Sequence, residues 1–305
     1  MEQARGFFKK IIELIKKPEL RILPGQLAFF LVLSLIPLIA LVGTLSSFLA
    51  IPISTIKDVL VDVIPYEVAE LIANIISGPS IEISFNIVFF MIVAFVLASN
   101  GTHSMIITSN EIYKINPNNI IKRRLKAILM ALILVTLFFF LLLIPIWGEI
   151  ILEVISKNAK PSAPMELIIN IFNLVQYPII ITILYSGIKT IYIIAPDEKI
   201  ESVTTTKGAI FTTIGWILAT EIYSFYIATF SNYDLFYGSI SNVVILLLWV
   251  YILSYIFVLG MILNAGNYKA SEEKKVRKEK EKEERIKTEE EKLEKAREEA
   301  LELHK

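Results

Sequence analysis

The sequence has no cysteine and only two histidines, His103 and His304. Disulfides and thiolate catalysis are therefore excluded, and the usual Cys/His zinc sites cannot be assembled. The sequence also lacks a G-x-x-x-x-G-K-[ST] stretch, so it carries no Walker-type loop for ATP. Charge is scarce over most of the length, because residues 271–305 hold 12 of the 30 basic and 13 of the 30 acidic residues. Residues 1–270 are thus a charge-poor body.

Long apolar runs in this body predict membrane spans. The chain is 55% apolar with a mean hydropathy of +0.63, which is too apolar for an ordinary soluble domain. A helix needs about 20 apolar residues, at 1.5 Å each, to cross the hydrocarbon layer. Each long stretch without Asp, Glu, Lys or Arg therefore accommodates one transmembrane helix. We predict an all-α, polytopic membrane protein with six transmembrane helices, at about residues 24–50, 84–109, 127–147, 166–194, 208–230 and 241–264.

Basic residues predict the orientation of these spans. The N-terminal segment (residues 1–21) and the second and fourth connecting segments carry 14 basic residues, whereas the first, third and fifth carry three. By the positive-inside rule, both termini are cytoplasmic. The first apolar stretch is longer than a signal-peptide core and lacks a cleavage site, so we expect it to stay in the mature chain. Residues 22–268 then form the membrane domain, and residues 269–305 form a charged cytoplasmic tail.

Three flanking segments have helical periodicity. Residues 7–15 read either as an amphipathic helix on the inner surface or as an ordinary juxtamembrane segment. After span one, residues 51–82 hold two amphipathic external helices divided by Pro65, which cap the outer mouth of the bundle or lie on its rim. The tail has Glu-to-Lys pairs at i,i+4 and only a weak heptad pattern, which favours a single solvated helix over a coiled coil.

Polar residues within spans four and five are candidates for a transport path. Glu221 is the one charged residue in the stretch of residues 208–233 and lies 13 residues into it, about 20 Å along a helix. It is either a proton-titrating site or a hydrogen-bond acceptor that joins neighbouring helices. Gln176 and Tyr185 of span four, and Tyr226 of span five, are further candidates for the same path.

Span two is too polar to face lipid, since Ser99, Asn100 and His103 lie within five residues of one another. A break in the helix at residues 100–101 is plausible for backbone that lines a cavity. His103 is either a proton shuttle or a satisfied hydrogen-bonding partner. Asn110 and Tyr113, at i,i+3, are expected to tie the inner end of the span to the basic second connecting segment.

Arg123 and Arg124 lie in that second connecting segment. Their charge is sufficient to explain the topology, and the same pair is a candidate for binding anionic lipid headgroups.

Four patterns of polar and aromatic residues follow one another along the spans. They are L-A-F-F-L-V-L-S-L-I-P-L at residues 27–38; S-N-G-T-H-S at 99–104 with N-E-I-Y at 110–113 and K-R-R-L at 122–125; residues 192–196 with Gly208, Ala209 and Trp216; and the run of residues 225–265 that contains Y-G-S-I-S-N and L-G-M-I-L-N-A. Their order resembles that of the YihY/BrkB family of bacterial inner-membrane proteins.

The resemblance implies six spans, both ends inside, a location in the plasma membrane and a transport role. Where the family commonly has Gly-Ala-Glu-x-Asn-Ala, residues 260–265 read G-M-I-L-N-A, so a carboxylate is missing. Members of this family have also carried the older name ribonuclease BN. Two histidines about 200 residues apart cannot supply the His-rich cluster of a zinc ribonuclease. The basic residues are those that topology requires, so no nucleic-acid partner is expected.

Two functional hypotheses follow. In the first, the chain moves a small polar solute or a lipid-like amphiphile along a path between spans two, four and five. In the second, it is a membrane scaffold whose charged tail recruits a cytoplasmic protein. Neither hypothesis makes the chain an enzyme or requires a cofactor.

Overall fold

The computed structural model describes residues 18–48, 51–61, 63–77, 83–116, 119–158, 163–230, 233 and 237–302. This part of the chain is entirely helical, which confirms the predicted all-α class. The candidate amphipathic helix at residues 7–15 lies outside the described residues. The helices are α2 (Pro18–Phe48), α3 (Ile53–Val61), α4 (Tyr66–Ile76), α5 (Ile83–Tyr113), α6 (Ile120–Asn158), α7 (Ala163–Ile194), α8 (Ser202–Phe230), η1 (Gly238–Ile240) and α10 (Ser241–Glu302).

Each of the six predicted spans coincides with a long helix. Four stretches of the described residues are long and apolar enough to cross a bilayer: Ile120–Ile146, Leu174–Ile194, Ser202–Thr229 and Ser241–Lys287. Large apolar side chains such as Leu132, Leu174 and Leu218 are exposed on these helices. Apolar side chains that face outward from an apolar helix are suited to lipid, so the chain is a membrane protein.

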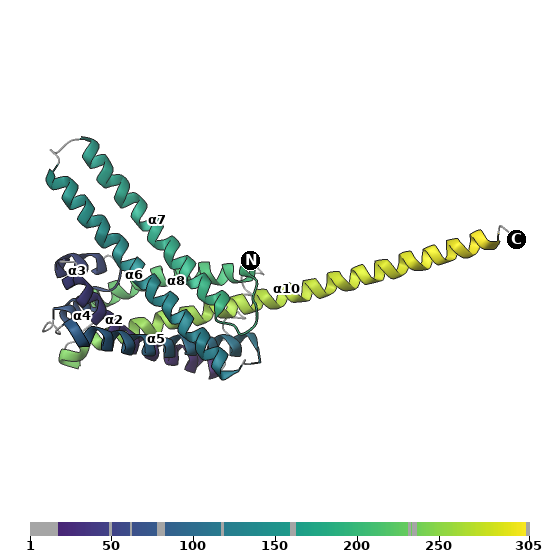
Figure 1. Cartoon of the computed structure of the whole chain (residues 1–305), viewed down its shortest axis with the longest axis horizontal. Helices are drawn as coiled ribbons and strands as arrows, with labels where there is room; N and C mark the ends of the chain where they lie inside the picture. The colour runs from purple at the N-terminus through teal and green to yellow at the C-terminus, as the bar shows by residue number, and fades with distance from the viewer. Residues whose placement is uncertain are drawn as a thin grey trace.

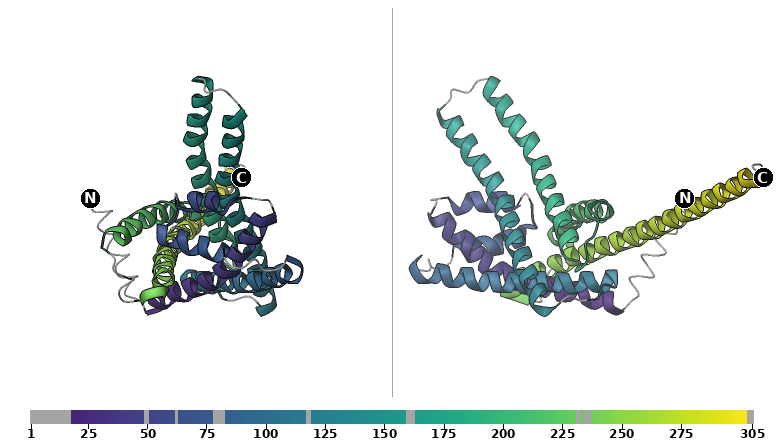
Figure 2. Two further views of the ribbon diagram at one scale, coloured as in Figure 1. Left: turned by 90° about the vertical axis from the view of Figure 1, so that its left-hand side faces the viewer. Right: turned by 45° about the vertical axis from the view of Figure 1, so that its right-hand side comes forward.

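The helices form a packed body from which two parts project. Helix α5 packs mainly on α2, α6 and α10, whereas α8 packs on α10 and α7. The hairpin of α6 and α7 rises away from this body towards the turn that joins the two helices (Figures 1 and 2). Helix α10 leaves the body at the opposite end and continues as a long arm (Figure 1). Helix α5 therefore packs mainly against α2 and α6.

The two amphipathic helices after span one are present as predicted. Helix α3 buries Ile56, Val59 and Leu60, and α4 buries Val68 and Ala69. Pro65 separates the two helices and precedes the first residue of α4. Helix α4 packs on α2 and α10, and α3 packs on α6. The pair covers the end of the body away from the projecting arm of α10 (Figure 1).

The tail continues the last apolar helix without interruption. Gly238, with φ of +53°, turns the chain into η1 just before α10 begins; this is the left-handed region that glycine adopts without strain. Helix α10 then runs to Glu302, so the charged tail is helical, as predicted. Lys275 Nζ lies 2.6 Å from Glu201 and 3.0 Å from Glu272, so the first turns of the tail are joined to the start of α8.

Helix α5 is continuous through residues 100–101, so the expected break is wrong. Gly101 is buried, and a side chain there would meet Phe30 of α2 at 3.6 Å. That distance is an ordinary van der Waals contact, so α2 packs on this turn without requiring a glycine, and the helix keeps its own backbone hydrogen bonds.

Helices α8 and α10 approach each other backbone to backbone. Asn264 Oδ1 accepts a hydrogen bond of 2.8 Å from the Gly208 amide. Tyr192 of α7 lies against this contact, where its hydroxyl donates to the Phe257 carbonyl at 2.7 Å and lies 2.7 Å from Thr212 Oγ1. A Cβ added at Gly208 would overlap the Gly260 carbonyl oxygen.

We therefore expect Gly208→Ala to lower the free energy of unfolding by about 1–3 kcal/mol, the usual cost of overpacking. Thermal unfolding of the purified chain in detergent measures the change. Gly266→Ala is the matched control, since it is also a helical glycine but a Cβ there would meet nothing within 4 Å. Equal melting temperatures for the two variants would contradict the close approach.

Candidate functional site

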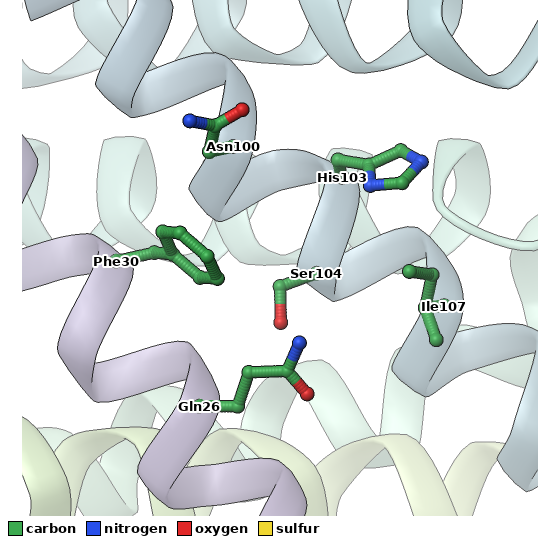
Figure 3. Close-up of a pocket in the computed structure, with 6 residues that line it drawn as sticks. All are labelled: Gln26, Phe30, Asn100, His103, Ser104 and Ile107. Atoms are coloured by element: carbon green, nitrogen blue, oxygen red, sulfur yellow. The ribbon is translucent and has the colours of Figure 1, made fainter.

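A polar pocket of about 250 Å³ lies between α2 and α5. It is lined by Gln26 and Phe30 of α2 and by Asn100, His103, Ser104 and Ile107 of α5 (Figure 3). The four α5 residues recur at intervals of three and four, so they share one face of that helix. Gln26 and Ile107 are exposed, whereas Ser104 is buried, so the pocket runs inward from the surface of the chain.

Ser104 forms the buried wall of the pocket. The residue is 2% exposed, and its hydroxyl has no hydrogen-bond partner among the described residues. Figure 3 shows this hydroxyl and the Gln26 amide pointing towards each other. A buried hydroxyl without a partner costs about 1–3 kcal/mol, so a polar group within the pocket would stabilise this wall.

Arg124 contacts Asn100, one of the residues that line the pocket. Its Nη2 donates a hydrogen bond of 2.9 Å to Asn100 Oδ1. Since the amide oxygen is engaged by the guanidinium, the amide nitrogen of Asn100 remains as a donor. His103 also lies within electrostatic range of Arg123 and Arg124. The polar lining is thus rich in hydrogen-bond donors and bordered by positive charge.

The same half of α5 contains further buried hydroxyls. Those of Ser99, Thr108, Ser109 and Tyr113 are buried and have no partner among the described residues. Thr102, by contrast, donates to the Ala127 carbonyl of α6 at 2.7 Å. Tyr113 lies past the predicted span; burial, with a smaller effect from Tyr268, raises its pKa far above the usual value, so the phenol stays protonated.

Asp197, in the connection between α7 and α8, joins the ends of three helices. Its side chain is 2% exposed and lies 3.1 Å from Lys126 Nζ of α6. Asn110 of α5 donates to Asp197 Oδ2 at 2.7 Å and accepts from the Asp197 amide at 2.8 Å. Lys126 also donates to the Pro196 carbonyl. Asn110 therefore binds the fourth connecting segment, which corrects the prediction that it binds the second.

The remaining candidate residues lie away from the pocket. Gln176 and Tyr185 are half-buried on α7, and Lys189 Nζ lies 5.8 Å from the centre of the Tyr185 ring. Glu221 and Tyr226 are exposed on α8. Glu221 lines a second hollow of about 370 Å³, together with Thr220 and Ser224 of α8 and Tyr66 and Glu67 of α4. The structure thus divides the candidates among a pocket on α5, a hollow beside α8 and separate positions on α7.

Three important residues were not identified from the sequence. Asp197 lies in a short polar connection, where carboxylates are usually solvated, although it directly follows the motif at residues 192–196. Lys126 was used only as one of the basic residues that predict the orientation of the spans. Phe30 supplies an apolar wall of the pocket, but a phenylalanine in an apolar span carries no signal of its own.

The Asp197 contacts give a stability prediction. Asp197→Ala leaves Lys126 and Asn110 without this partner, and we expect a loss of about 1.5–3 kcal/mol, as for a hydrogen bond to a charged group. Melting of the detergent-solubilised chain measures it, with the exposed neighbour substitution Glu198→Ala as control. Once Asp197 is replaced, Asn110→Ala should cost less than it does in the wild type, because only its bond to the backbone amide of residue 197 is left to lose; fully additive losses would contradict the shared network.

Comparisons with known proteins agree on one family. Residues 13–285 match the family described as Virulence factor BrkB. The "Putative ribonuclease-like protein YfkH" of Bacillus subtilis (strain 168) is 29% identical over 250 residues, which cover 80% of this chain and 89% of that protein. A "UPF0761 membrane protein" of Chlorobium luteolum is 23% identical over 264 residues, covering 81% of this chain and 57% of that protein.

A shorter match is to the "UPF0761 membrane protein NT05HA_1801" of Aggregatibacter aphrophilus, which is 35% identical over 69 residues, covering 23% of this chain and 24% of that protein. No solved structure matches. Because the family match covers most of the sequence, this chain belongs to the BrkB family of membrane proteins.

Proposed function

We propose that the chain is a transporter of a small polar solute or an amphiphile in the bacterial inner membrane. In this proposal six helices cross the bilayer, α2, α5, α6, α7, α8 and α10, and both termini are cytoplasmic. The pocket between α2 and α5 then lies in the cytoplasmic half and admits the transported molecule. The observation that carries the proposal is the buried, unpartnered hydroxyl of Ser104 in a pocket that reaches the surface.

The distribution of polar groups supports a path rather than helix contacts alone. A polar residue that only joins helices is expected to find its partner on a neighbouring helix, as Thr102 does on α6. Ser99, Ser104 and Thr108 of α5 are buried without one. The second hollow, with Glu67 and Glu221, lies at the other end of the body, beside α4. Polar groups are therefore available in both halves of the proposed membrane domain.

Ribonuclease activity is not part of this proposal, although the name of the Bacillus relative is "ribonuclease-like". The sequence supplies two histidines, of which only His103 lies in the described chain. Its electrostatic neighbours are two arginines and Asp197, and that carboxylate is already bound by Lys126 and Asn110. Two-metal or zinc hydrolysis requires several such ligands around one centre.

The proposed topology predicts a labelling pattern. The chain has no cysteine, so single substitutions report their own side of the membrane. We expect a membrane-impermeant thiol reagent to label Asp58→Cys on intact spheroplasts. Glu198→Cys and Lys278→Cys should react only after the membrane is opened. All three positions are exposed in the structure; labelling of Lys278→Cys on intact spheroplasts would contradict cytoplasmic termini.

The transport proposal predicts a change in cell composition. Deleting the gene should alter one exported solute or one lipid in paired profiles of the medium and of the membrane. Wild type should restore it, while Ser104→Ala, at matched expression, should restore it only partly. Profiles that are unchanged under several stresses, or that Ser104→Ala restores completely, would contradict the role of the pocket in transport.

The continuous arm of α10 favours a second function, a scaffold that recruits a cytoplasmic protein. Lys275 contacts Glu201 and Glu272, and the side chains that the structure describes within residues 273–290 are exposed. Truncation after Lys280 keeps these contacts and removes the rest of the arm. In the same profiling experiment, a transporter should survive this truncation. If the truncated chain fails to complement while Ser104→Ala succeeds, the scaffold function is favoured.

A further inference from the structure

The lining of the α2–α5 pocket selects the charge of its ligand. Its polar groups are Gln26, Asn100, His103 and Ser104, each of which can donate a hydrogen bond, and no carboxylate belongs to the lining. Among the described residues, neither Arg123 nor Arg124 forms an ion pair with a carboxylate, because the nearby Asp197 pairs with Lys126. A site that is rich in donors, bordered by cations and free of acids is suited to an anion.

The geometry further restricts the anion. The donors come from two helices: the Gln26 amide projects from α2 towards the Ser104 hydroxyl of α5, while the Asn100 amide and the His103 ring project from α5 in other directions (Figure 3). Several donors suit an oxyanion with several acceptor oxygens. Arg124 orients the donor amide of Asn100, because it donates a hydrogen bond to Asn100 Oδ1. The volume of about 250 Å³ lies below the about 300–1,000 Å³ of sites for drug-sized ligands, so the pocket accommodates a headgroup rather than a whole lipid.

We infer that the α2–α5 pocket is a binding site for a phosphate group, held by Ser104, Gln26, Asn100 and His103, with Arg124 as the positioning residue for Asn100. Two sources share this chemistry: the monoester headgroup of an anionic lipid and a free phosphate. Phe30 and the exposed Ile107 give the pocket an apolar border beside its polar groups. The inference rests on the proposed transport function only in naming the class of molecule that would be carried.

The test measures binding by the full-length purified chain, without transport. In nanodiscs of phosphatidylcholine containing phosphatidic acid, native mass spectrometry should show preferential retention of phosphatidic acid. Ser104→Ala and Arg124→Gln should each weaken this retention about tenfold, as expected for a lost hydrogen bond to a charged group. Detergent-solubilised chain is titrated with inorganic phosphate in parallel, with the same variants.

Two control variants match the chemistry of the test variants. Ser109→Ala removes another buried, unpartnered hydroxyl of α5 that does not line the pocket. Lys122→Gln removes a neighbouring exposed positive charge. Both should retain the ligand to within about twofold, since neither loses a charged hydrogen bond in the pocket. A melting temperature close to wild type shows that each variant is folded.

Each outcome decides the inference. Pocket-dependent binding of phosphatidic acid alone identifies a lipid headgroup, and pocket-dependent binding of inorganic phosphate identifies a free phosphate; both support the site. Binding of neither probe, or equal losses in Ser104→Ala and Ser109→Ala, overturns it. If pocket-dependent binding is found but the profiles of the deletion strain are unchanged, the site stands and the transport function fails.

Discussion

The whole structure depends on one constraint: polar groups of a chain that lies in hydrocarbon must find their partners within the protein. Helices meet this constraint for the backbone, and every long element described here is a helix. Helices α8 and α10 go further, because Gly208 and Gly260 remove side chains where the backbones meet and Asn264 bonds the Gly208 amide. Tyr192 reaches the same region and donates to a main-chain carbonyl of α10. Among the described residues, buried side-chain groups without a hydrogen-bond partner gather on α5, although Ser254 Oγ and Asn264 Nδ2 of α10 and Arg123 Nε of α6 also lack one.

The Asp197 network explains how a polar half of the body remains ordered. A carboxylate buried to 2% exposure is stable only when positive charge and donors surround it. Lys126 supplies the charge and Asn110 supplies both a donor and an acceptor. These three residues belong to α5, α6 and the α7–α8 connection, so one ion pair fixes the ends of elements far apart in sequence. The pairing also neutralises Lys126 while leaving Arg124 for Asn100, which keeps the border of the pocket positive.

The sequence was sufficient to predict the long helices, the two amphipathic helices around Pro65 and the charged terminal helix. Each of these follows from periodicity or charge, which are local properties of the chain. The sequence did not predict which faces meet. Asn100 and His103 line one pocket, whereas Glu221, expected on the same path, lies next to α4. Helix pairing depends on small residues such as Gly208 and Gly260, whose effect appears only when the facing helix is known.

The two hollows differ in the charge of their lining residues. The α2–α5 pocket contains amides, a hydroxyl and an imidazole beside arginines, whereas the hollow beside α8 contains Glu67 and Glu221. The first therefore favours anions and the second disfavours them. An anion bound at the first pocket would not be held in the second hollow, so an asymmetry of charge between the two ends is built into the fold. If the proposed transport function holds, this asymmetry suits release of an anion at the acidic end, since a transported molecule must bind on entry and leave on exit.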